Sequence, residues 1–231
     1  MTGKLTEEAT ARLTLGDLAG IKEFLGREDD AGFLECADQY RDVMHQKVTG
    51  DWPLDYLLFR IVLSRFRGGG ADKYPFRMGL QRTTRLIEGL LERGGRVPSL
   101  RRGFRDALVG DESRWGGVNK WGCFTLEDRI GILSFLSARG LKGRADLKRY
   151  AGYVLASALK DAWMVKDDIT TTSPFEDERD VLTTLRVHQL MELGADTSSM
   201  APPWHRERNT VAEYASSLDD PEISAALHGQ C

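Results

Sequence analysis

Short segments in which apolar residues recur every three or four positions run along most of the chain. This spacing places the apolar side chains on one face of an α-helix. Leucine adds to the helical bias, with 29 residues against 18 for valine and isoleucine together, and no stretch shows sustained apolar–polar alternation. The sequence therefore predicts an all-α fold. The segments with helical spacing are residues 15–25, 57–66, 86–91, 130–136, 150–163, 182–191 and 211–227.

Glycine follows several of these segments. Gly94 and Gly194 each come directly after a Leu-rich or Met-rich turn, and Gly70 and Gly140 occupy similar positions. Glycine just past a helix readily adopts the left-handed conformation that ends it. Because each predicted helix is short and has one apolar face, neighbouring helices must cover that face. The pattern therefore indicates a repeated unit of stacked helices.

The C-terminal segment carries a motif that resembles the ankyrin repeat. The sequence Gly-Ala-Asp at residues 194–196 is followed by Thr210, which starts the first helix of a unit, and Ala212 and Ala215 then let that helix pack closely. Residues 223–227 form the second helix of the unit in this match. Residues 16–25 resemble the turn and second helix of the same unit, and residues 85–96 resemble another second helix.

The resemblance implies an ankyrin-like helical-repeat array, an α-solenoid, as one domain over residues 1–231. Ankyrin units recur about every 33 residues, whereas the four glycines are 24, 46 and 54 residues apart and the Thr-Pro-Leu-His signature is absent. We therefore expect degenerate repeats with loop insertions near residues 110–124 and 166–178. An α-helical domain outside the ankyrin family is the alternative.

Two loops combine tryptophan with cations and have no helical period. Tryptophan and arginine dominate the binding energy of typical protein interfaces, and insertions in repeat proteins tend to lie on one face. The rings either bind a partner or fold back to cover the helices beneath them. The predicted partner-binding residues are Arg114, Trp115, Lys120 and Trp121 in the first loop and Trp204, His205 and Arg206 in the second.

Catalytic chemistry is the alternative from a different class. Cys123 with His188 or His205 would supply a thiol and its base, and the acidic stretch 167–180 would supply acid–base groups. A buried structural thiol and an acidic first turn of a helix explain the same residues. The chain's four histidines lack the spacing of a zinc site, and Gly68-Gly69-Gly70 is not followed by the Lys-Ser/Thr of a phosphate-binding loop. We expect no metal site, no cofactor and no enzymatic activity.

Charge is distributed unevenly along the chain. Residues 1–59 carry a net charge of −6, residues 60–120 carry +8, residues 121–159 carry +3 and residues 160–231 carry −8. These charges either interleave on solvated helix faces or form a basic surface for an acidic partner. Nucleic-acid binding through the basic stretch 60–120, which includes Arg96, Arg101, Arg102 and Arg105, is a weaker alternative, because the chain has no known recognition module.

The sequence therefore predicts a non-enzymatic protein-binding module that recognises a partner protein through a helical groove and the Trp/Arg loops. An inhibitor or immunity-type role, in which the chain neutralises an enzyme or toxin, is the narrower form of this hypothesis. No apolar run reaches the length of about 20 residues that crosses a membrane, and the N-terminus lacks a secretory signal. We therefore expect a cytoplasmic protein; its partner and oligomeric state stay open.

Overall fold

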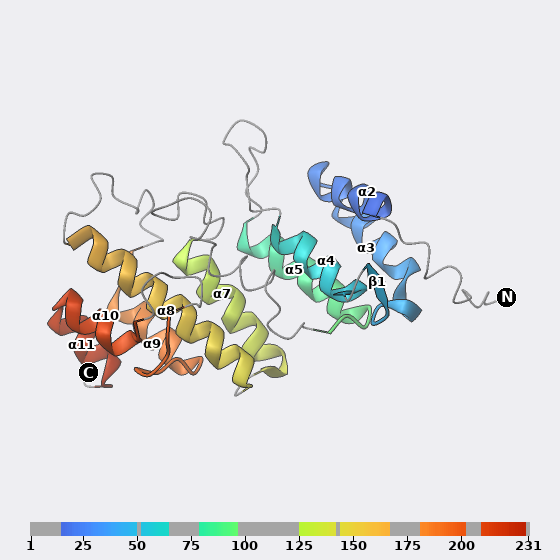
Figure 1. Cartoon of the computed structure of the whole chain (residues 1–231). Coiled ribbons are helices and arrows are strands. Elements are labelled where there is room, and N and C mark those ends of the chain that lie inside the picture. The colour runs from blue at the N-terminus through green and yellow to red at the C-terminus, as the bar shows by residue number, and fades with distance from the viewer. Residues whose placement is uncertain are drawn as a thin grey trace. The chain divides into compact units, whose positions relative to one another are not determined.

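The computed structural model describes seven stretches of the chain, and most of their residues are helical (Figure 1). Strands within them are limited to β1 (Lys47–Thr49) and β2 (Trp52–Pro53), which form a short antiparallel pair. The all-α prediction is therefore confirmed. The stretches are residues 15–49, 52–64, 79–96, 125–141, 144–166, 181–201 and 209–229.

The chain divides into two compact units. The N-terminal unit comprises residues 1–65 and 76–104, and the C-terminal unit comprises residues 66–75 and 105–231. The predicted single repeat domain over residues 1–231 stays a prediction. Its expected insertion near 110–124 lies outside the described residues, as does all of the expected insertion at 166–178 beyond Lys166.

The N-terminal unit consists of packed helix pairs. Helix α2 packs on α3, α4 packs on α5, and α3 also packs on α5. Their apolar faces form a common core that contains Phe33, Leu54, Leu58, Phe59, Leu86 and Leu90. The bounds are α2 (Leu15–Gly26), α3 (Asp30–Gln39), the 3-10 turn η1 (Arg41–Val43), α4 (Leu54–Ser64) and α5 (Leu80–Glu92).

Helix α3 was not predicted from the sequence. Only Phe33 and Ala37 are buried on it, so few apolar side chains mark its inner face. Its start is set instead by Asp29, whose carboxylate accepts the Gly32 N–H at 2.7 Å. The resemblance placed a turn at the beginning of residues 16–25, but that segment lies wholly within α2.

A buried carboxylate joins three parts of the N-terminal unit. Asp55, in the first turn of α4, accepts the Tyr56 N–H at 2.7 Å and the Arg96 N–H at 3.1 Å. The ring nitrogen Nδ1 of His45 lies 3.0 Å from the same carboxylate. Burial of a charged group is costly unless hydrogen bonds satisfy it. Asp55 therefore acts as a structural tie between the turn before β1, the start of α4 and the chain after α5.

Arg82 joins α5 to the end of α2 and the start of α3. Its guanidinium donates to both carboxylate oxygens of Asp30, at 2.7 to 3.1 Å, and to the carbonyl of Leu25 at 3.3 Å. The side chains of Arg82 and Asp30 are 18% and 21% exposed, so water screens the pair only in part. Two-pronged geometry of this kind is specific to arginine.

We predict that Arg82→Ala lowers the free energy of unfolding of this unit by about 1–3 kcal/mol, because it leaves the Asp30 carboxylate without its donor and removes one of the two donors to the Leu25 carbonyl. Arg82→Lys restores the charge but not the fork, so it recovers part of the loss. Urea unfolding followed by circular dichroism measures both. The control is Arg27→Ala, since Arg27 pairs with Glu23 on an exposed surface and such pairs contribute little. Equal stability of Arg82→Ala and Arg27→Ala would contradict the assignment.

The C-terminal unit is built around one long helix. Helix α8 packs on α7, α9 and α10, and α9 also packs on α11. A π-helical turn, η3 (Ser137–Leu141), follows α7. The bounds are α7 (Leu126–Leu136), α8 (Ala145–Lys166), α9 (Thr184–Glu192), α10 (Val211–Leu218) and α11 (Pro221–Leu227).

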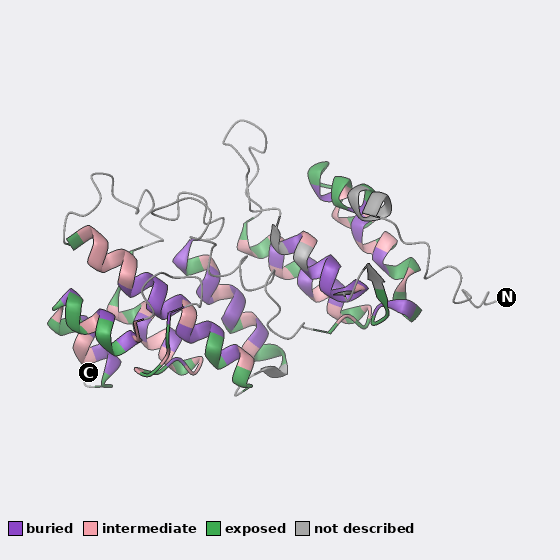
Figure 2. Cartoon of the chain, in the orientation of Figure 1, coloured by how far each residue is buried: buried purple, intermediate pink, exposed green. Residues whose placement is uncertain are grey.

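The middle of α8 is covered on every side. Residues 154–159 are all buried, as the continuous purple section of the helix shows (Figure 2). Six consecutive residues exceed one helical turn of 3.6 residues, so no face of this section is open to solvent. The exposed Lys148 and Arg149 lie nearer its start, where one side of the helix is uncovered.

The last helix pair lies at the residues predicted for it. Thr210 precedes α10, and its hydroxyl accepts the Glu213 N–H while Glu213 accepts the Thr210 N–H, a capping box that begins the helix. The second helix, α11, covers the predicted residues 223–227. The prediction that Ala212 packs closely is wrong: Ala212 is exposed, and Val211, Tyr214 and Leu218 form the buried face.

None of the helices in the described ranges is long and apolar enough to cross a membrane.

Candidate groove in the C-terminal unit

The end of α9 is a tight turn that the sequence signals clearly. Gly194 has a φ angle of +101°, the left-handed conformation expected of a glycine after a helix. The Gly194 N–H donates to the Met191 carbonyl and the Ala195 N–H donates to the Leu190 carbonyl, which closes the last turn of the helix. Asp196 follows at the surface.

Asp196 organises the next three residues. Its carboxylate accepts the Ser198 N–H at 2.9 Å, the Ser198 hydroxyl at 2.6 Å and the Ser199 hydroxyl at 3.4 Å. The Asp196 N–H donates in return to Ser199 Oγ at 3.1 Å. These bonds fix the turn at residues 196–199, which is short enough for the carboxylate to reach its own backbone.

The turn continues into a β-bridge with the chain before α10. Met200 pairs with Thr210 in an antiparallel bridge, in which the Ala201 N–H donates to the Asn209 carbonyl at 2.9 Å and the Val211 N–H donates to the Ser199 carbonyl at 2.8 Å. The chain therefore leaves this bridge after residue 201 and returns to it at residue 209.

Gly152 lets the turn approach α8. A Cβ atom at this glycine would lie 2.4 Å from Ser199 Oγ and 2.5 Å from Ser199 Cβ, well inside van der Waals contact. A glycine within a helix costs about 1 kcal/mol relative to alanine. At this position the missing side chain makes room for the close contact of Ser199.

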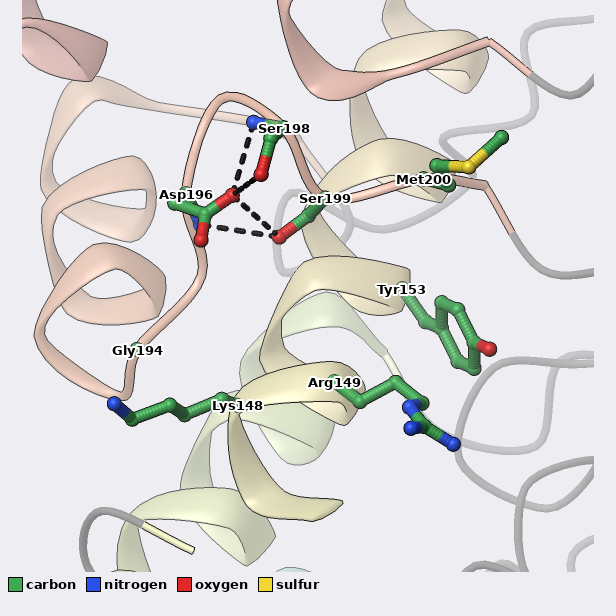
Figure 3. A pocket seen from close by; sticks show the side chains of 8 residues that line it. All are labelled: Lys148, Arg149, Tyr153, Gly194, Asp196, Ser198, Ser199 and Met200. Carbon is green, nitrogen blue, oxygen red and sulfur yellow. Dashed lines mark hydrogen bonds between the residues drawn. The ribbon is translucent and has the colours of Figure 1, made fainter. Parts of the chain in front are cut away.

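A groove of about 190 Å³ lies between the turn and α8 (Figure 3). We call it the α8 groove. Lys148 extends along it toward Gly194, whereas Arg149 extends toward the side where Tyr153 lies (Figure 3). Met200 is 43% exposed at the bridge. The residues that line the groove are Lys148, Arg149, Tyr153, Gly194, Asp196, Ser198, Ser199 and Met200.

Hydrogen bonds lower the pKa of two carboxylates in this region. The pKa of Asp196 lies below its ordinary value of 3.8, chiefly because the Ser198 hydroxyl donates to the carboxylate. The Ser198 N–H, the Ser199 hydroxyl and the Ser199 N–H lower this pKa further. The Thr210 N–H and then its hydroxyl lower the pKa of Glu213. Both side chains are negatively charged at neutral pH.

The seven predicted partner-binding residues lie outside the described residues. The prediction that they form a partner-binding surface therefore stays a prediction. Trp204, His205 and Arg206 belong to a loop whose two ends are described. The β-bridge of Met200 with Thr210 holds those ends together. For Arg114, Trp115, Lys120 and Trp121 it describes neither neighbour.

The residues of the alternative functions also lie mostly outside the described part. Cys123, His205, residues 167–180, Arg101, Arg102 and Arg105 belong to this set. Arg96 is exposed, and its backbone N–H binds Asp55. Within the described residues, no group of three or more His, Cys, Asp or Glu side chains is arranged to hold a metal ion.

Sequence reasoning did not select the groove residues Lys148, Arg149, Tyr153 and Met200. The signal was present in Gly152, an isolated glycine in an otherwise strongly helical segment, which marks a close approach by another part of the chain. The two serines after Asp196 were a second signal, since they are typical of a turn closed by an aspartate.

Comparison of the chain with protein-family models, with curated proteins and with solved structures finds no match.

We predict that Gly152→Ala lowers the free energy of unfolding by about 1–3 kcal/mol, the usual cost of overpacking, although alanine is the better helix former. The added methyl group must displace Ser199 and the turn with it. The matched control is Gly20→Ala in α2, where a Cβ meets no atom within 4 Å, and this substitution should be neutral or stabilising. Thermal unfolding of both variants measures the difference. A stabilised Gly152→Ala variant would show that the turn does not need this close approach.

The titration of Asp196 provides a second check. We predict that its pKa, followed by carboxyl-carbon NMR, lies below 3.8 in the native chain and rises toward that value in Ser198→Ala. Because the folded-state pKa is the lower one, the stabilisation is present above pH 3.8 and is lost as the pH falls through the lowered pKa. Ser216→Ala is the control, since that hydroxyl donates to the Ala212 carbonyl. An ordinary pKa for Asp196 in the native chain would contradict the hydrogen bonds described.

Proposed function

We propose that the chain is a non-enzymatic protein-binding module, in which stacked helix pairs present a groove and projecting loops to a partner protein. Recognition in this mechanism occurs by surface complementarity, with aromatic and arginine side chains as anchors. The observation that carries the proposal is the anchored base of the loop 202–208: the bridge between Met200 and Thr210 lies at the rim of the α8 groove.

The packing of the C-terminal helices supports the ankyrin-like form of the proposal. Helices α8 and α10 pack together, α9 and α11 pack together, and α8 also packs on α9. In a stack of helix pairs, the first helices of neighbouring units form one layer and the second helices form the other. With α8–α9 and α10–α11 as units, the turn at residues 194–200 and the loop that follows it connect one unit to the next.

The loop 202–208 has the composition of a binding element. It carries Trp204, His205 and Arg206 on a short connection whose ends are held by two backbone hydrogen bonds. Fixing the ends of a loop reduces the entropy that is lost when it binds. The inhibitor or immunity-type role stays a prediction within this proposal, because it depends on the identity of the partner.

The test is capture of a partner by the tagged full-length chain from extracts of its source cells, with chemical crosslinking to locate the contact. We expect a partner at near-equal molar ratio, crosslinked within residues 194–210. Trp204→Ala and Arg206→Ala should abolish capture without changing the helical circular dichroism, and Arg85→Ala, on the exposed face of α5, should retain it. Capture that survives both loop substitutions, or loss of folding in Trp204→Ala, would refute the assignment of this loop to the interface.

A further inference from the structure

Two cations of the α8 groove differ from their neighbours. Arg144 pairs with Asp146, Arg186 pairs with Glu127, and the Lys166 ammonium donates to the carbonyls of Leu218 and Asp219. Among the Lys and Arg side chains that the structure describes in the C-terminal unit, Lys148 and Arg149 are the two that form no hydrogen bond, ion pair or ring contact.

The carboxylate of the groove does not neutralise these cations. Asp196 accepts hydrogen bonds from the Ser198 N–H, the Ser198 hydroxyl and the Ser199 hydroxyl, and no ion pair with Lys148 or Arg149 occurs. All three of these bonds reach the same oxygen, Oδ1, and hold it in the turn. Two positive charges therefore remain available in the groove to an added anionic group.

The side chains between and beside the cations are partly apolar. Tyr153 is half-buried on α8, and Met200 presents its thioether at the bridge. Figure 3 shows Arg149 and Tyr153 on the same side of the groove and Lys148 reaching toward Gly194 on the other. The groove thus offers a cation toward each end and apolar surface at the Tyr153 side, a pattern that suits an extended chain more than a single compact anion.

We propose that the α8 groove binds an extended acidic segment of the partner protein, an inference that rests on the function proposed above. Carboxylates of that segment pair with Lys148 and Arg149, and an apolar side chain packs on Tyr153 and Met200. Opposite charges across an interface raise the association rate and fix the orientation of the partner. A nucleic-acid backbone fits less well, because it carries a phosphate at every nucleotide and so places negative charge beside the ionised Asp196, whereas a peptide can place a neutral residue there.

The direct test measures fluorescence anisotropy of a labelled peptide of alternating Glu and Leu residues with the full-length chain. We expect saturable binding that weakens as salt rises, and binding about tenfold weaker for the matching Gln–Leu peptide. Lys148→Glu and Arg149→Glu should each weaken binding of the acidic peptide by about tenfold, and Arg149→Gln by less. The control Arg85→Glu makes the same change in net charge on α5 and should leave binding unchanged.

Three outcomes would overturn the inference. Equal affinity for the Glu–Leu and Gln–Leu peptides would show that the carboxylates do not contribute to binding. Tighter binding of a single-stranded oligonucleotide at the same residues would show that the ligand is a nucleic acid. The peptide could also bind only after acidic residues of the stretch 167–180 are changed to their amides, at Glu176, Asp177, Glu178 and Asp180. That result would show that the chain's own acidic stretch occupies the groove.

The inference and the proposed function fail in different ways. If the native partner is captured equally well by Lys148→Glu and Arg149→Glu, the protein-binding function stands and the acidic segment is wrong. The opposite result is that no partner is captured, although the acidic peptide binds and depends on Lys148 and Arg149 as expected. In that case the groove binds acidic chains, but the proposed protein-binding function is wrong.

Discussion

The burial of residues 154–159 of α8 is the constraint on which the rest of the C-terminal unit depends. A helical section that is apolar or small on all its faces is stable in water only if other helices surround it. Helices α7, α9 and α10 supply that cover, and each is too short to be stable alone. Packing against one shared helix therefore replaces the local stability that the short helices lack.

The groove follows from the same arrangement. The first turns of α8 extend beyond the fully covered section, so Lys148 and Arg149 stay at the surface. Gly152 brings the turn at residues 196–199 against this exposed part, and the Asp196 hydrogen bonds hold the turn in place. The groove therefore has the backbone of the turn on one side and exposed cationic side chains on the other.

Sequence patterns located the helices that bury a strong apolar stripe. The predicted segments at 15–25, 86–91, 130–136, 150–163, 182–191 and 211–227 all correspond to helices, the last as the pair α10 and α11. Helix α3 was missed because an N-cap at Asp29 and only two buried side chains define it, so it contains few apolar residues to signal a helix. Gly94 and Gly194 have the positive φ angles expected of residues that end helices.

The candidate site was predictable only in part, since a groove depends on contacts between distant segments. The Gly-Ala-Asp motif at residues 194–196 marks one wall of the groove. The opposite wall is the face of α8 that other helices leave uncovered, and apolar periodicity alone does not identify that face. Composition pointed to Trp204 and Arg206, which combine chemistry typical of interfaces in one loop. The unpaired state of Lys148 and Arg149 became visible only when the neighbouring ion pairs were known.

Native-state hydrogen exchange tests most directly the claim that helix pairs are stacked on α8. In such a stack the terminal pair has a neighbour on one side only, so it should open at a lower free energy than the interior. The account predicts that amides of α10 and α11 exchange through a partial opening while residues 154–159 exchange only with global unfolding. Exchange of α8 through local opening while α10 and α11 stay protected would contradict it.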